Sequence, residues 1–131
     1  MQYRRANQPG GTYFFTVVTY ERRKLFIDEA TVDLLRQAVR SVMANHPFEI
    51  LASVILPDHL HMIWKLPEDD ADFSTRWRLI KAQFSHRYLV KPAAATASRM
   101  SKGEQNIWQR RFWEHLIRDE QDLHRHIEYI H

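Results

Sequence analysis

The chain has 131 residues, 44% of them hydrophobic and 12% aromatic, which is enough for one compact domain with a core and excludes wholesale disorder. It contains no cysteine, so disulfides, thiolate zinc sites and cysteine nucleophiles are excluded. The net charge of +3 permits a polyanionic partner without requiring one. Residues 1–10 are polar and basic, and no apolar stretch approaches membrane-spanning length, so we expect a soluble, intracellular protein with no membrane contact.

The first part of the chain predicts two strands separated by a helix. Residues 12–20 are β-branched and aromatic, which is typical of a strand. Residues 28–45 carry apolar side chains at steps of three and four, which predicts a helix that ends before His46-Pro47. Residues 48–56 are nearly all apolar, which predicts a strand in the centre of a sheet.

The second part continues with a hairpin. A tight turn at Pro57-Asp58 leads into a strand over residues 59–66. Residues 73–90 predict a helix with one apolar stripe, and residues 107–113 predict a fourth strand. A last helix begins near Asp119, a plausible N-cap residue.

The order β-α-β-β-α-β followed by a helix predicts an α+β fold. It is a ferredoxin-like sandwich with a four-stranded antiparallel sheet and an added C-terminal helix. Residues 91–104 are rich in small and polar residues and read as a loop rather than a domain boundary, so residues 1–131 form a single domain. Because this fold serves many functions, the function has to be argued from the site.

Two histidines stand one residue apart in the predicted strand 59–66. Side chains alternate between the faces of a strand, so His59 and His61 point the same way, about 7 Å apart along the chain. The residues that alternate with them are apolar and face the core, so the two imidazoles form half of a metal site or, alternatively, a solvated polar face. His124 and His126 have the same spacing, but two residues of helix turn by about 200°, so these two cannot share a metal.

The last helix carries a tyrosine at the edge of its apolar stripe. Leu123, Ile127 and Ile130 form that stripe, and Tyr129 and His126 lie along its border. A tyrosine can attack phosphorus and form a covalent phosphotyrosine. A metal on the same phosphate would assist it as a Lewis acid. The alternative is that Tyr129 is an ordinary amphipathic boundary residue.

Basic residues fall in pairs beside aromatic residues. Arginines bind phosphates and aromatic rings stack on unpaired bases, so this mixture suits single-stranded nucleic acid. Equally, the aromatic rings could belong to the core and the arginines to the solvated surface. The pairs proposed as DNA-binding are Arg4 and Arg5, Arg22 and Arg23, and Arg110 and Arg111.

Three blocks of this sequence resemble the REP-associated tyrosine transposases, a branch of the single-strand insertion-sequence transposases in the HUH endonuclease superfamily. His59-Leu60-His61, within PDHLHMIW, matches the family's His-hydrophobic-His motif. The stretches YRRANQPGGTYFFTVVTYERRKLF and WQRRFWEHLIRDEQDLHRHIEYIH are also similar to that family, and the second places its catalytic tyrosine at Tyr129. The resemblance covers nearly the whole chain.

The resemblance implies a metal-dependent endonuclease and strand transferase that cleaves single-stranded DNA next to a hairpin. Tyr129 would remain attached to a 5′ phosphate and release a 3′ hydroxyl, with Mg²⁺ or Mn²⁺ held by His59 and His61. The expected partner is DNA with hairpins like repetitive extragenic palindromes, in the cytoplasm of a bacterium and associated with its nucleoid. The resemblance leaves both a monomer and a dimer open.

One departure from the family concerns the metal ligands. Relatives continue past the tyrosine, and a polar residue one helical turn later completes their metal site. Here the sequence stops at His131, which implies a domain truncated at its C-terminus. His126, one turn before Tyr129, is the candidate auxiliary ligand. The alternative function is therefore a catalytically impaired module that binds single strands or hairpins. A metal-independent two-histidine phosphoesterase is disfavoured, because only one strand carries histidines in this pattern.

Overall fold

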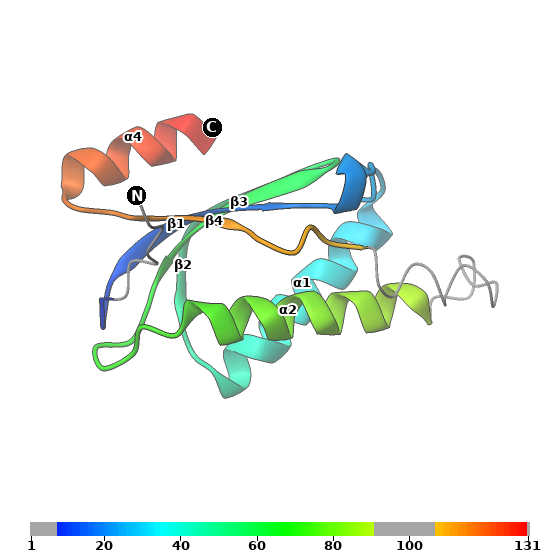
Figure 1. Cartoon of the computed structure of the whole chain (residues 1–131), viewed down its shortest axis with the longest axis horizontal. Helices are drawn as coiled ribbons and strands as arrows, with labels where there is room; N and C mark the ends of the chain where they lie inside the picture. Colours follow the sequence, from blue (N-terminus) through cyan, green and yellow to red (C-terminus); the bar gives the residue numbers. More distant parts are fainter. Residues whose placement is uncertain (1–7, 91–106, 131) are drawn as a thin grey trace.

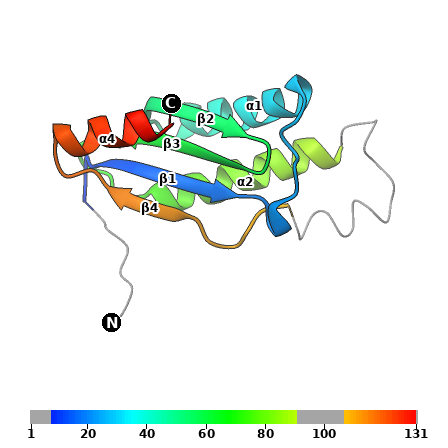
Figure 2. The ribbon, with the colours of Figure 1, turned by 90° about the horizontal axis from the view of Figure 1, so that it is seen from above.

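The protein is described by a computed structural model of residues 8–90 and 107–130, and within these residues four strands form one antiparallel sheet. The strands are β1 (Thr12–Val18), β2 (Glu49–Leu56), β3 (His59–Lys65) and β4 (Trp113–Leu116), in the spatial order β2-β3-β1-β4. Helices α1 (Glu29–Asn45) and α2 (Phe73–Leu89) cover one face, and α4 (Glu120–Ile130) lies on the other (Figures 1 and 2). The predicted ferredoxin-like fold with an added C-terminal helix is confirmed.

Each long helix begins at an aspartate that caps its first turn. The carboxylates of Asp28, Asp72 and Asp119 each accept the backbone N–H three residues further on, at 2.7, 3.0 and 2.8 Å. Each bond satisfies a donor that the helix leaves free, worth about 1 kcal/mol. The predicted helix starts are therefore explained by local chemistry. Among the described residues, no helix combines the length and the apolar character needed to span a membrane.

The core lies between the sheet and the pair α1 and α2. The apolar stripe of α2 and the alternate residues Leu60, Met62 and Trp64 of β3 are all buried there. The rings of Trp64 and Trp77 stack with centroids 4.5 Å apart. Each large side chain buried in this way contributes roughly 1.5–3 kcal/mol. A one-residue slip of β3 would expose them all, so the core fixes which face receives the intervening histidines.

One predicted position in the sheet is wrong. The run at 48–56 predicted a central strand, but β2 lies at an edge, beside β3 alone. Its apolar character has another cause, because β2 packs toward α1 on one face and also contacts α4 on the other. The pairing with β3 is irregular between Ile50 and Ala52, so Leu51 forms a bulge.

The predicted strand at 107–113 is also wrong in its extent. Trp108 forms only an isolated bridge to Thr19, and β4 begins at Trp113, which pairs with Thr16. Between these two pairs β1 has two residues, whereas the other segment has four, 109–112. The extra residues bow out of the ladder as a wide bulge, and this bulge carries Arg110 and Arg111.

Candidate functional site

His59 and His61 lie together on the sheet face opposite the core. Their ring centroids are 4.9 Å apart, with planes at 79°. His61 is 6% exposed, whereas His59, beside the turn between β2 and β3, is half-buried. The face is therefore not a solvated polar surface, because α4 shields part of it (Figure 2).

Both rings are held through the same nitrogen. His59 Nδ1 lies 2.7 Å from Asp58 Oδ1, and His61 Nδ1 lies 2.9 Å from Thr16 Oγ1. A carboxylate only accepts hydrogen bonds, so His59 carries its proton on Nδ1 and keeps a lone pair on Nε2. The Thr16 hydroxyl can accept from His61 in the same way. Proteins commonly orient metal-binding histidines by such contacts, which leave Nε2 for the ligand.

Asp58 is itself held in place by the segment that follows β1. Arg22 Nε donates to Asp58 Oδ2 at 3.1 Å. The backbone N–H of the buried Thr19 donates to the Asp58 carbonyl at 3.0 Å, and its hydroxyl is shared between the carbonyls of Arg23 at 2.7 Å and Asp58 at 3.0 Å. The hydrogen bond from His59 is the largest effect on the pKa of Asp58 and outweighs burial, which acts in the opposite direction. The charge and the hydrogen bond of Arg22 add to the effect of His59, so the pKa of Asp58 lies below its ordinary value. The carboxylate therefore stays ionised and keeps orienting His59 at neutral pH.

Arg22 reaches Asp58 from an unusual backbone. Glu21 and Arg22 have φ of 53° and 51°, in the left-handed region that residues other than glycine seldom adopt. Consecutive residues of this kind are strained, and such strain often accompanies functional sites. The short 3-10 helix η1 (Tyr20–Arg22) is thus built to bring a guanidinium to the carboxylate behind His59.

His61 is suited to bind a metal as a neutral imidazole. Burial, and secondarily repulsion from His59 when that ring is protonated, lowers the pKa of His61 below its ordinary value, and a hydrogen bond with the Phe15 backbone opposes them in part. A metal ligand must be deprotonated, so a lowered pKa keeps the lone pair available to a lower pH.

Tyr129 lies beside His61 on the same face of the sheet. Its ring centroid is 5.4 Å from that of His61 and 6.1 Å from that of Phe14. The side chain is 69% exposed, so its hydroxyl is open to a ligand. Tyr129 lies in the last turn of α4, and these two ring contacts place it over Phe14 of β1 and His61 of β3. The structure therefore brings together three of the predicted site residues, His59, His61 and Tyr129.

His126 lies on the other side of Phe14. The Phe14 ring contacts His61 at 5.3 Å and His126 at 4.8 Å between centroids, so it stands between the two histidines. His126 Nδ1 donates to the backbone carbonyl of Asp122 at 2.8 Å, and its ring stacks on His115. Its role as an auxiliary ligand stays a prediction, and its observed contacts belong to a separate cluster.

That cluster, formed by His115, Asp122 and His126, was not predicted. Asp122 is buried, and its Oδ2 accepts from His115 Nε2 at 2.9 Å and from the backbone N–H of Arg118 at 3.0 Å. The three side chains offer ligand atoms within 4.8 Å of one another, a donor set that could hold a transition metal. Because the Asp122 oxygens already have donors, we interpret the cluster as the anchor that ties α4 to β4.

Removing the anchor should destabilise the protein in a pH-dependent way. Burial alone would raise the pKa of Asp122, but the Arg118 N–H and His115 outweigh it and hold that pKa well below its usual range. The stabilisation is therefore complete above the unfolded pKa of about 3.9 and is lost as the pH falls further. We expect Asp122→Ala to lower the free energy of unfolding by about 2–3 kcal/mol at pH 7. Urea denaturation between pH 3 and 7 measures it.

The control for this prediction is Glu128→Ala, which removes an exposed carboxylate from the same helix. It should change stability by no more than about 0.5 kcal/mol. The difference between the wild type and Asp122→Ala should narrow below about pH 4. A difference of equal size at pH 3 and pH 7 contradicts the interpretation.

The predicted DNA-binding arginines are dispersed. Arg4 and Arg5 lie outside the described residues. Arg22 is paired with Asp58, and the Arg23 guanidinium lies 5.8 Å from the centroid of the Tyr20 ring. Arg110 and Arg111 are exposed on the bulge before β4. DNA contact by these residues stays a prediction.

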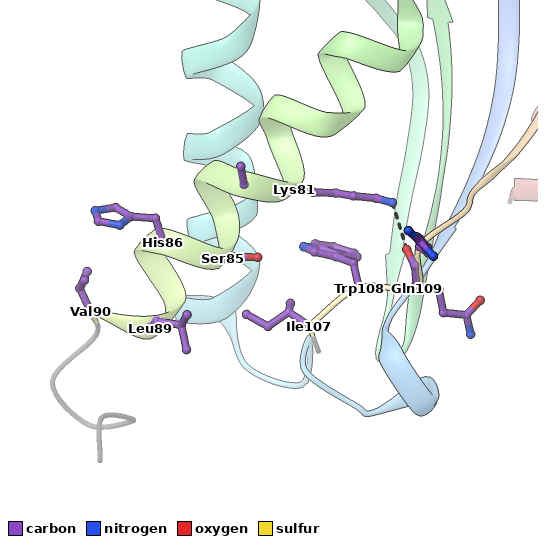
Figure 3. Close-up of a pocket in the computed structure, with 10 residues that line it drawn as sticks. Lys81, Ser85, His86, Leu89, Val90, Ile107, Trp108 and Gln109 are labelled. Carbon is purple, nitrogen blue, oxygen red and sulfur yellow. Dashed lines mark hydrogen bonds between the residues drawn. The ribbon is translucent and has the colours of Figure 1, made fainter. Parts of the chain in front are cut away.

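A cavity of about 590 Å³ lies away from the histidines, between the C-terminal half of α2 and residues 107–110 (Figure 3). Lys81 Nζ donates to the Gln109 carbonyl across it at 3.1 Å, and Trp108 and Arg110 also line it. Neither histidine of the pair nor Tyr129 lines this cavity, so it is not part of the candidate site.

The chain is similar to known proteins over nearly its whole length. A family model described as "Transposase IS200 like" matches residues 8–131. The chain is 46% identical over 129 residues to the REP-associated tyrosine transposase of Escherichia coli (strain K12), covering 98% of the chain and 69% of that protein. It is also similar to a solved REP-associated tyrosine transposase bound to a REP hairpin, with a TM-score of 0.81 and 45% identity, covering 99% of this chain and 70% of that one. A Deinococcus radiodurans crystal structure shares the fold, with a TM-score of 0.63 at 17% identity, covering 100% of this chain and 98% of that one.

Proposed function

The chain belongs to the IS200-like transposase family, and we propose that it is a single-strand DNA endonuclease and strand transferase acting next to DNA hairpins. The observation that carries the proposal is the position of the exposed Tyr129, with its ring 5.4 Å from that of His61. The similar solved protein is bound to a REP hairpin, which supports a hairpin of that kind as the partner.

The proposed cleavage is a transesterification, in which the phosphoryl group passes from the 3′ oxygen of the DNA to the oxygen of Tyr129. Tyr129 Oη attacks the scissile phosphodiester, and the bond from phosphorus to Oη forms as the bond to the 3′ oxygen breaks. The phenolic proton passes to solvent, and the leaving oxygen takes up a proton to become a 3′ hydroxyl. The protein keeps the 5′ phosphate as a phosphotyrosine. Attack of another 3′ hydroxyl on that phosphotyrosine restores Tyr129 and joins the strands.

A divalent cation fits the two histidines. Both Nδ1 atoms are engaged, so His59 and His61 can each offer Nε2. Nitrogen donors suit Mn²⁺ better than Mg²⁺, which prefers oxygen ligands. The cation would supply Lewis-acid stabilisation of charge on the phosphate oxygens. The shielding of His61 by the sheet and by α4 strengthens that effect, since electrostatic interactions are stronger away from bulk water.

The test is a cleavage assay on a DNA hairpin with a labelled single-stranded flank. We expect a covalent protein–DNA adduct on a denaturing gel with Mn²⁺ or Mg²⁺, and a released fragment with a 3′ hydroxyl that a polymerase can extend. EDTA should suppress both products, and a fully paired duplex of the same sequence should give neither. Salt-sensitive binding without any adduct would instead identify a binding module on the same fold.

Asp58 should control the affinity for the metal. In Asp58→Asn the side chain loses its charge, so it holds the Nδ1–H of His59 less firmly. Loss of such a supporting contact typically weakens metal binding by about 10- to 100-fold. Titration of Mn²⁺, followed by calorimetry or by its electron spin resonance signal, measures the change. The matched control is Asp33→Asn, an exposed carboxylate of α1 paired with Arg36, and equal affinities in the two variants would sink this prediction.

A further inference from the structure

Trp113 is an aromatic side chain exposed beside the site. It is 72% exposed, whereas Trp64 and Trp77 are buried in the core. A tryptophan ring offers a large, flat apolar area to a molecule that covers it. The exposed ring of Trp113 is therefore available to a bound molecule.

The sheet places Trp113 on the same face as the histidines. Trp113 pairs with Thr16 across β4 and β1, and Thr16 pairs with His61 across β1 and β3. Paired residues on antiparallel strands share a face, so the three form one row across the sheet. Two strand spacings separate the ends of this row, roughly 10 Å. Thr16, in the middle, is also the residue that holds His61 Nδ1.

The surroundings of the ring favour nucleic acid over an apolar partner. The exposed Arg111 precedes Trp113 by two residues and offers a positive charge for phosphate. α4 lies over one end of the sheet (Figure 2), where His115 contacts Asp122, whereas Trp113 lies two residues before His115 on the same face and is exposed. A flat exposed ring with a cationic side chain nearby is suited to stack on an unpaired base.

We propose that Trp113 stacks on an unpaired base next to the phosphate that Tyr129 attacks. This inference rests on the proposed endonuclease function and names its substrate more closely. The stacked base fixes the strand along the row from Trp113 to His61, so that the scissile phosphate lies at the histidine end. Because every base has a flat face, Trp113 holds the strand in position without reading its sequence.

The test combines Trp113 variants with DNA that lacks single bases. Affinity for the hairpin with its single-stranded flank is measured in EDTA by fluorescence anisotropy. The DNA set carries an abasic site at each flank position in turn. Loss of one aromatic stack should weaken binding of Trp113→Ala roughly 5- to 150-fold, and Trp113→Phe should keep most of the affinity. One abasic position should weaken the wild type by a similar factor and leave Trp113→Ala unaffected.

The control variant is Val90→Ala, which removes another exposed apolar side chain at the end of α2, on the opposite side of the sheet. It should bind the DNA hairpin with wild-type affinity. The inference is wrong if Trp113→Ala binds the DNA like the wild type. It is also wrong if every abasic site weakens Trp113→Ala by the same factor as it weakens the wild type. If Trp113→Ala changes the molecular mass measured by sedimentation but not the DNA affinity, a second copy of the chain covers the Trp113 ring instead of a base. Failure of the endonuclease proposal looks different, because the wild type then forms no adduct on any DNA.

Discussion

Tyr129→Phe is expected to abolish the covalent protein–DNA adduct. The change removes one oxygen, and the remaining ring cannot form a bond to phosphorus. Loss of a covalent nucleophile lowers the rate by at least about a thousand-fold. The side chain is largely exposed, so stability should change by no more than about 0.5 kcal/mol, and hairpin affinity should remain close to that of the wild type. Denaturing gels with labelled DNA, together with a thermal melt, measure all of these.

The matched control for this variant is Tyr88→Phe, which removes a hydroxyl from α2 on the other side of the sheet. It should form the adduct at the normal rate. An adduct that persists in Tyr129→Phe would show that another residue is the nucleophile. An adduct lost in both variants would show that the effect lies in the fold and not in the chemistry.

The second large effect is expected from the histidine pair. His59→Ala removes one of two nitrogen donors and should lower both metal affinity and cleavage by at least about 100-fold. His61→Asn should do the same, and the smaller polar side chain limits the damage at a buried position. Binding of the hairpin in EDTA should be unchanged in both variants. Metal titration and single-turnover cleavage give the two quantities.

His86→Ala is the control, since it removes an exposed histidine from α2 and should have normal metal affinity. Higher Mn²⁺ should partly restore cleavage in His59→Ala, because a weakened site can still be filled at a higher concentration. Full cleavage in either variant at low Mn²⁺ would show that His59 and His61 take no part in the mechanism. Wild-type cleavage that persists in EDTA would show the same.

The sequence predicted the features that depend on neighbouring residues. Alternation along 59–66 identified the faces of β3, and Asp119 marked the start of the last helix because capping acts within one turn. The edge position of β2 and the bulge at 109–112 escaped prediction, because strand order and register depend on residues far away in the chain. An apolar run looks the same in a central strand as in a partly buried edge strand such as β2.

The same distinction holds within the site. The His-x-His spacing and the border position of Tyr129 are local patterns, so the residues could be proposed from sequence. The contact of Thr16 with His61 and the anchor of Asp122 with His115 join different elements, and no spacing in the sequence reveals them. Asp58 adjoins His59, so its position was plain, but its contact depends on the rotamers of both side chains.

Tyr129 lies on α4, whereas His59 and His61 lie on β3, so the two parts of the candidate site belong to separate elements. The core lies on the other face of the sheet, so α4 can leave its place without opening that core. The buried Asp122 carboxylate and Ile130 at the end of the helix therefore determine how firmly α4, and with it Tyr129, is held against the sheet.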